Sequence, residues 1–201
     1  MAETEIVDWK KVQEIIEFQL SKPTHARGWV WHGNKPQAER FIMRDFIETL
    51  GAMGKLDFTN TQQRKPEHAP DFFADAQDGT RVAFEVSEFV SQEARRLTAR
   101  TGKGYIPSWS DEQFHAAIDK IIRKKDKKVF KDGPYSKITL VIPTDEAMVA
   151  HEMVDRVFSA GRFAKARQIT DGYLMMEAPL RLPEPGKVTN RSCVLFKIPF
   201  E

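Results

Sequence analysis

The chain has 201 residues with a formal net charge of +2, 41% hydrophobic residues and 30% charged residues. No apolar run is long enough to cross a bilayer, which argues against a membrane-spanning protein, and the single cysteine, Cys193, excludes an internal disulfide and a cysteine-rich zinc site. We expect one domain over residues 1–201 and no membrane partner. Because the polar N-terminus does not resemble a secretory signal, we also expect a cytoplasmic location.

The hydrophobic pattern predicts helices and strands in the order helix, helix, three strands, helix, strand, helix and two strands. The predicted helices are 8–22, 36–53, 111–130 and 145–161, and the predicted strands are 55–60, 71–76, 81–90, 136–143, 172–177 and 192–199. Residues 77–80, Gln-Asp-Gly-Thr, are typical of a hairpin turn. Residues 91–109 are expected to form a basic loop. This order predicts an α/β fold with a mixed central sheet flanked by helices.

Two carboxylates belong to the predicted hairpin. Period-two alternation within 81–90 places Glu85 between hydrophobic neighbours on one face of its strand. Asp71 begins the preceding strand, and the hairpin brings it beside Glu85. Two carboxylates this close resist ionising together unless a cation lies between them. The pair therefore predicts a site for Mg²⁺, which binds one or two carboxylates and completes its shell with water and phosphate oxygens.

A third acid, Glu39, lies in the helix predicted before the hairpin. At about 100° per residue, four apolar residues of this helix fall within roughly 60° of Glu39. These residues are Ile42, Met43, Phe46 and Leu50. An acid in the middle of an apolar face is costly unless it is paired or binds a metal. The alternative is an acid near a helix N-terminus, where the macrodipole favours it.

These residues resemble the PD-(D/E)xK nuclease superfamily, which has the restriction-endonuclease-like fold. That family has an acid on a helix, a hairpin that reads Pro-Asp and then acid-x-Lys, a second helix and another strand. Pro70 and Asp71 match the first half of the motif, and Glu85 matches its second acid. Glu39 matches the acid on the helix. The resemblance covers residues 36–143, and it implies a restriction-endonuclease-like core with the N-terminal helix and the C-terminal helix and strands as additions.

The chain departs from the family motif at Ser87, where the family has a lysine. That lysine helps to activate the attacking water and stabilises charge on the phosphate, which a serine cannot do. In some members of the family the following helix supplies the lysine instead. Lys120 and Lys124 lie nearest the apolar boundary of the predicted helix 111–130. We take Lys124 as the first candidate for this role and Lys120 as the second.

The resemblance implies hydrolysis of phosphodiester bonds, with DNA as the expected substrate and Mg²⁺ or Mn²⁺ as the cofactor. Asp71 and Glu85 would hold the metal. Glu39 and the backbone carbonyl of Val86 would complete the set of ligands. Lys124 or Lys120 would offset the charge that develops in the transition state.

Because the net charge is nearly zero, attraction to nucleic acid depends on where basic residues gather. The candidates for contact are Arg95, Arg96, Arg100, Lys103 and Lys127. They would hold the phosphate backbone without reading the base sequence. A solvated helix face and an ordinary surface loop are the alternatives for these residues.

Two other readings of the whole chain remain open. In the first, the nuclease fold is kept without its chemistry, which leaves a module that binds nucleic acid or a protein partner. Ser87 favours this reading. In the second, the chain is an interaction or immunity-type partner with an unrelated α/β fold, and the placement of Glu39 and Asp71 argues against it. A homodimer is compatible with each reading.

Overall fold

The computed structural model describes residues 35–65, 68–163, 166–177 and 193–200. The chain divides into two compact units, and Ser91–Pro107 is the described part of the smaller one. The helix expected at 8–22 lies outside the described residues, and the expectation of a single domain stays a prediction. Among the residues that the structure describes, no helix is both long and apolar enough to cross a membrane.

The larger unit is built on one six-stranded sheet whose spatial order follows the sequence. Its strands are β1 (Phe58–Gln63), β2 (Phe72–Ala76), β3 (Arg81–Val86), β4 (Lys137–Thr144), β5 (Asp171–Glu177) and β6 (Cys193–Lys197). The first three strands are antiparallel, β3 to β5 run parallel, and β6 is antiparallel to β5. The predicted mixed sheet is therefore confirmed.

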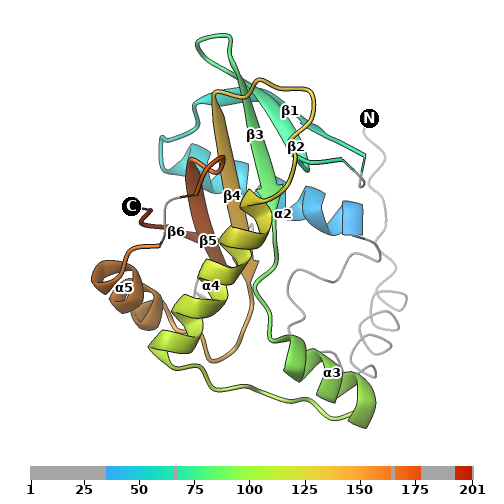
Figure 1. Ribbon diagram of the computed structural model, residues 1–201, viewed down its shortest axis with the longest axis vertical. Coiled ribbons are helices and arrows are strands. Elements are labelled where there is room, and N and C mark those ends of the chain that lie inside the picture. The colour runs from blue at the N-terminus through green and yellow to red at the C-terminus, as the bar shows by residue number, and fades with distance from the viewer. Residues whose placement is uncertain (1–34, 66–67, 164–165, 178–192, 201) are drawn as a thin grey trace, which may run out of the picture. The chain divides into compact units, whose positions relative to one another are not determined.

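Helices cover both faces of this sheet (Figure 1). One face carries α2 (Lys35–Ala52), and the other carries α4 (Asp111–Asp126) and α5 (His151–Ala160). Parallel neighbours need a crossover connection, which α4 supplies between β3 and β4 and α5 supplies between β4 and β5. The α/β class with flanking helices follows from this arrangement.

The side chains of β3 alternate between the two layers of the core. Val82, Phe84 and Val86 belong to the cluster under α2, whereas Ala83 belongs to the cluster under α4 and α5. This alternation confirms the period-two prediction. Glu85 accordingly shares the sheet face that α4 covers.

The turn between β2 and β3 forms at the predicted residues. Ala76 N donates to Thr80 O at 2.8 Å, and Thr80 N donates to the carboxylate of Asp78 at 2.9 Å. Gly79 has φ of 81°, a left-handed conformation that favours glycine. The turn fixes the register of the hairpin, in which Phe72 pairs with Phe84. One further step along this register brings Asp71 opposite Glu85.

Several predicted elements and boundaries are wrong. Strand β1 is Phe58–Gln63 and not 55–60, and β3 ends at Val86 and not at 90. Part of the expected loop 91–109 is helix α3 (Gln92–Thr101), because Ser91 caps its N-terminus through Ala94 N at 3.1 Å and Gly102 ends it with φ of 68°. Helix α5 begins at His151 and not at 145, since a turn precedes it in which Val149 N donates to Glu146 O at 3.0 Å. Helix α4 ends at Asp126 and not at 130.

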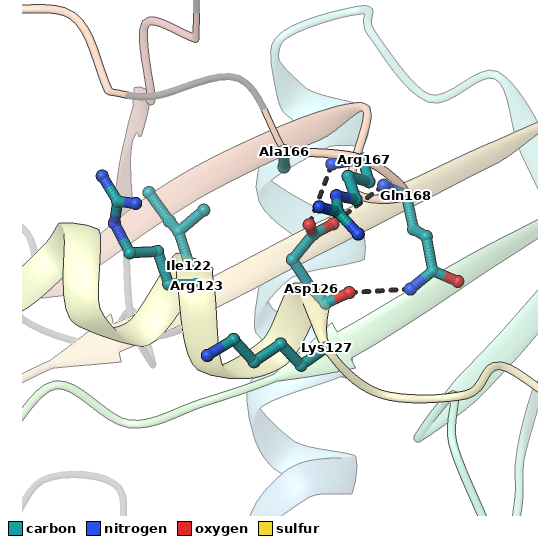
Figure 2. A pocket seen from close by; sticks show the side chains of 7 residues that line it. All are labelled: Ile122, Arg123, Asp126, Lys127, Ala166, Arg167 and Gln168. Carbon is teal, nitrogen blue, oxygen red and sulfur yellow. Dashed lines mark hydrogen bonds between the residues drawn. The ribbon is translucent and has the colours of Figure 1, made fainter.

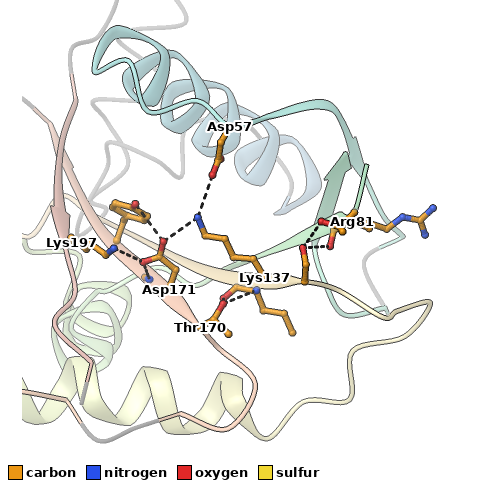
Figure 3. A network of polar contacts seen from close by, with 11 residues as sticks. Asp57, Arg81, Lys137, Thr170, Asp171 and Lys197 are labelled. Atoms are coloured by element: carbon orange, nitrogen blue, oxygen red, sulfur yellow. Dashed lines mark hydrogen bonds and ion pairs between the residues drawn. The ribbon is translucent and has the colours of Figure 1, made fainter. Parts of the chain in front are cut away.

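A charged network joins the N-terminal ends of β4 and β5 (Figure 3). Lys137 Nζ lies 3.3 Å from Asp171 Oδ2 and 3.8 Å from Asp57 Oδ2. Lys197 Nζ lies 3.6 Å from Asp171 Oδ1. Burial, together with repulsion from Asp171, raises the pKa of Tyr173 to about 12. The network contains two acids and two lysines, so its charges balance, and its ion pairs stabilise this end of the sheet.

We expect Leu140→Ala to lower the free energy of unfolding by about 2–5 kcal/mol, because it removes a fully buried side chain and leaves a cavity. Urea unfolding at neutral pH measures this difference. Met148→Ala is the control, since Met148 is 52% exposed and its loss should change the free energy by less than about 0.5 kcal/mol. Equal effects of the two substitutions would contradict the assignment of β4 to the core.

Candidate active site

Asp71 stands directly before β2, and backbone hydrogen bonds hold its segment from two directions. Arg64 N donates to Asp71 O at 2.9 Å, and Lys131 N donates to Ala69 O at 3.0 Å. The Oδ2 atom of Asp71 accepts the backbone amide of Val86 at 2.7 Å. The hairpin therefore fixes the Asp71 carboxylate, which is 5% exposed, against the end of β3.

Glu85 is fully buried, and two lysines from the end of α4 neutralise it. Lys125 Nζ donates to Glu85 Oε1 at 2.6 Å and to the backbone oxygen of Val86 at 2.6 Å. The ammonium group of Lys128 also contacts Glu85 Oε1. A carboxylate oxygen and a backbone carbonyl thus converge on one positively charged atom, which is the arrangement that a cation site requires.

The structure places Lys125 and Lys128, and neither Lys124 nor Lys120, at the acid pair. Lys120 and Lys124 lie on the exposed side of α4. The choice of Lys124 and Lys120 is corrected here because the register of the helix turns them away from the sheet.

A signal for Lys125 was present in the sequence. The buried side of α4 consists of Phe114, Ile118, Ile122 and Lys125. The lysine continues the apolar series at the three-or-four-residue spacing of a helix face. It also places an ammonium group at the backbone oxygen of Val86, the residue before Ser87.

Charges in this cluster shift the pKa values of its members. Burial, with repulsion from Glu85, raises the pKa of Asp71 to about 6, while attraction to Lys125 opposes this rise. Burial lowers the pKa of Lys125 despite its attraction to Glu85. Burial also works against the charge of Lys128, but the hydrogen bond and attraction from Glu85 raise the pKa of Lys128. The partly exposed lysine is thus the more firmly charged of the two.

Glu39 is buried on α2 as predicted, at 6% exposure, and its carboxylate lies 3.3 Å from Lys35 Nζ. Its charge makes a small contribution to the raised pKa of Asp71. Among the described residues, no three His, Cys, Asp or Glu side chains are gathered closely enough to hold a metal. The structure therefore brings Asp71 and Glu85 together without adding Glu39 as a third ligand.

The predicted nucleic-acid contacts fall in both units. Arg95, Arg96, Arg100 and Lys103 belong to the smaller unit, on α3 and just after it. Lys127 caps the end of α4 and lines a cavity of about 740 Å³ (Figure 2). Arg123 and Arg167 line the same cavity. The positive charge at the end of α4 is therefore greater than the predicted lysine alone would give.

The oxygens around Lys125 suit a hard divalent cation. Glu85 Oε2 is buried and has no hydrogen-bond partner among the described residues. Magnesium binds carboxylate and carbonyl oxygens, and it needs only one or two carboxylates from the protein. Asp71, Glu85 and the carbonyl of Val86 thus fit a two-carboxylate site, in which Glu85 Oε2 is the oxygen still to be satisfied.

Comparison of the chain with protein-family models, curated proteins and solved structures found no match. The geometry of the cluster around Glu85 is therefore the basis for inferring a function.

We expect Lys125→Met to lower the free energy of unfolding by about 3–5 kcal/mol, because it removes one partner of a buried ion pair. Adding Glu85→Gln to this variant should recover most of the lost free energy of unfolding, since the double variant no longer buries a Glu85 carboxylate without the Lys125 ammonium. Lys124→Met is the matched control and should stay within about 0.5 kcal/mol of wild type in urea unfolding. A Lys125→Met protein as stable as the control would refute the ion pair.

The raised pKa of Asp71 predicts a pH dependence of stability. Between the unfolded pKa of about 3.9 and the folded pKa of about 6, the native state keeps a proton that the unfolded chain has lost. The contribution of Asp71 to the free energy of unfolding should therefore fall as pH rises from 4 to 7, by about 3 kcal/mol.

Subtracting the urea-unfolding free energy of Asp71→Asn from that of wild type at each pH isolates this contribution. Asp78→Asn is the control of opposite sign. Hydrogen bonds from Thr80 lower the pKa of Asp78, so its favourable contribution is lost as pH falls. A wild-type minus Asp71→Asn difference that is flat from pH 4 to pH 7 would contradict the shifted pKa.

Proposed function

We propose that this chain is a metal-dependent nuclease with a restriction-endonuclease-like core at residues 36–143, and that its substrate is DNA. The observation that carries the proposal is the convergence of Glu85 Oε1 and the Val86 carbonyl on Lys125 Nζ, with Asp71 hydrogen-bonded to the amide of Val86. These groups meet at the carboxyl end of β3, where α/β sheets commonly bind their ligands.

Asp71, Glu85 and the Val86 carbonyl would hold Mg²⁺ or Mn²⁺. When bound, the metal polarises the scissile phosphate and lowers the pKa of a water molecule. The unsatisfied Glu85 Oε2 supports this assignment, because a buried carboxylate oxygen without a donor is costly. Glu39 would act from a distance through its charge on Asp71.

The two lysines would have different tasks. Lys125 is 8% exposed and holds the Val86 carbonyl and Glu85 together, so it orders the oxygens of the site. The Lys128 side chain is 37% exposed, and its raised pKa keeps it charged. Lys128 is therefore suited to contact a substrate phosphate and to stabilise the charge that develops on it.

Contacts with the nucleic-acid backbone would come from basic residues beyond the acid pair. Lys127, Arg123 and Arg167 surround one cavity at the end of α4. Arg96, Arg100 and Lys103 are exposed on the smaller unit, where Arg95 lies on the same helix. Such contacts to phosphates would bind without sequence preference and would weaken as salt concentration rises.

A second candidate function is a binding module that keeps the fold without hydrolysis. The observation that favours it is the position of Lys125, whose ammonium group already neutralises Glu85 and contacts the Val86 carbonyl. In that case the lysine serves in place of a metal, and Ser87 marks lost chemistry.

Incubation of plasmid and single-stranded DNA with Mg²⁺ or Mn²⁺ tests the proposal. We expect cleavage by wild type and a loss of about 10²–10³-fold in rate for Asp71→Asn and for Lys128→Met, because the first removes a ligand of the proposed metal and the second removes a positive charge at the reacting phosphate. Lys124→Met is the matched lysine control and should cleave within about twofold of wild type, since Lys124 lies on the exposed side of α4.

Calorimetric titration with Mn²⁺ separates the two functions without relying on activity. Binding by wild type that is lost in Asp71→Asn supports the nuclease. Absence of both metal binding and cleavage would refute the nuclease and favour the binding module instead. Cleavage by Asp71→Asn at the wild-type rate would refute the assignment of the site.

A further inference from the structure

Lys125 lies in the last turn of α4 and Lys128 just beyond it, yet Asp126, which ends the helix between them, faces elsewhere. Successive helical residues project about 100° apart, so Asp126 points away from the sheet face that Lys125 reaches. Figure 2 shows the Asp126 carboxylate turned toward the loop 166–169, beside the cavity lined by Lys127. This loop leads into β5 and lies outside the hairpin and helix that form the site.

The Asp126 carboxylate accepts three consecutive backbone amides of this loop. Arg167 N donates to Oδ2 at 2.8 Å, and Gln168 N and Ile169 N donate to Oδ1 at 2.8 and 3.1 Å. Burial works against the charge of Asp126, but these bonds hold the pKa of Asp126 below its usual value. A carboxylate at a helix C-terminus is normally unfavourable, because the macrodipole is negative there. The three amides compensate for this position.

The Gln168 side chain also links the loop to the end of α4, in this case as the donor. Its Nε2 donates to the backbone oxygen of Asp126 at 2.7 Å and to that of Lys128 at 2.9 Å. The last carbonyls of a helix lack partners within the helix, and here a side chain supplies one. Lys128 lies beyond the helix end, so its backbone position depends on this bond and on Lys128 N donating to Lys125 O at 3.1 Å.

Hydrogen bonds and core packing hold the loop 166–169 against the sheet. Thr170 N donates to Ile138 O at 2.9 Å, and Ile138 N donates to the Thr170 hydroxyl at 3.1 Å. Ile169 is 3% exposed and packs in the core under α4. A continuous set of bonds therefore runs from β4 through the loop to Asp126, and from there to the lysines on either side of it.

We infer that Asp126 and Gln168 are positioning residues that fix the Lys125 and Lys128 ammonium groups at Glu85, and that the loop 166–169 thereby controls the proposed catalytic site. The effect on catalysis rests on the proposed function, whereas the effect on the lysines does not. Within the part of the chain that the structure describes, neither residue forms a hydrogen bond or ion pair with Asp71 or Glu85, so both act through the helix end. Residues that orient reacting groups from outside a site commonly change activity by about 10–100-fold.

Reductive methylation of the full chain, followed by mass spectrometry, measures the accessibility of each lysine. In Asp126→Ala we expect Lys125 and Lys128 to react roughly tenfold faster than in wild type, because local opening of the helix end exposes them. Lys137 is the internal reference, since its side chain is also 37% exposed and ion-paired but belongs to the network at the other end of the sheet. Its rate should not change.

Asp119→Asn is the matched control on the same helix. Asp119 Oδ2 pairs with Arg123 Nε at 2.5 Å, and among the described residues Asp119 has no hydrogen bond or ion pair with the loop or with the site lysines. In the Asp119→Asn variant, Lys125 and Lys128 should be methylated at the wild-type rate. Asp126→Asn keeps one acceptor oxygen and should fall between Asp126→Ala and wild type, which is the graded response that a positioning role predicts.

DNA cleavage with Mg²⁺ supplies the second readout. We expect Asp126→Ala to lower kcat by about 10–100-fold with KM within about twofold of wild type, because the substrate contacts outside the Glu85 cluster remain while the lysine charges within it move. Unchanged lysine reactivity and unchanged kcat relative to Asp119→Asn would overturn the inference. If wild type cleaves nothing, the proposed function fails and the methylation rates alone decide whether Asp126 positions the lysines.

If Lys137 also reacts faster, Asp126→Ala has lost its overall fold, and Gln168→Met decides the question. This variant removes only the two side-chain hydrogen bonds to the helix end at similar volume. Selective exposure of Lys128 supports the inference, and wild-type reactivity of Lys128 overturns it.

Discussion

Burial of the Glu85 carboxylate is the constraint on which the candidate site depends. Glu85 lies in β3 between two neighbouring strands, with none of its surface exposed. An isolated buried charge costs several kcal/mol, so a cation must accompany it in the folded state. Helix α4 meets this need by ending over β3 with Lys125 on its buried side and Lys128 just beyond its end. The crossover that makes β3 and β4 parallel therefore also supplies the charge that allows Glu85 to be buried.

The charged clusters at the two ends of the sheet differ in how well their oxygens are satisfied. Both Asp171 oxygens have partners: Oδ1 accepts from Gly172 N, and Oδ2 lies beside Lys137. At the other end, Lys125 and Lys128 share Oε1 of Glu85, whereas Oε2 has no hydrogen-bond partner among the described residues. A fully satisfied network is explained by stability alone. The unsatisfied Glu85 oxygen, together with the raised pKa of Asp71, is what supports the proposed cation site at this end of the sheet.

The same oxygens would serve two different chemistries, depending on whether a lysine ammonium alone or a metal as well is bound to them. With the Lys125 ammonium alone, the Val86 carbonyl and Glu85 form a neutralised structural pair. With a divalent metal as well, the same groups would organise a phosphate and a water molecule. Asp71 is central to this choice, because its repulsion from Glu85 favours additional positive charge. The position of the lysines is in turn set from outside the hairpin, by Asp126 and the loop that it binds.

The sequence by itself determined the local features of this protein. Alternation in β3, the turn at Gly79 and the buried side of α2 containing Glu39 were all predictable, because each depends on residues close together in the chain. The capping residues Ser91 and Gly102 were equally local signals, but the basic composition of residues 91–109 led to the prediction of a loop instead of helix α3. Only the tertiary structure decided which lysine serves the acids. Lys125 lies 40 residues beyond Glu85, and its ammonium reaches Glu85 only because α4 packs with that side against the sheet. For the same reason the bonds between Asp126 and Gln168, 42 residues apart, leave no pattern in the sequence.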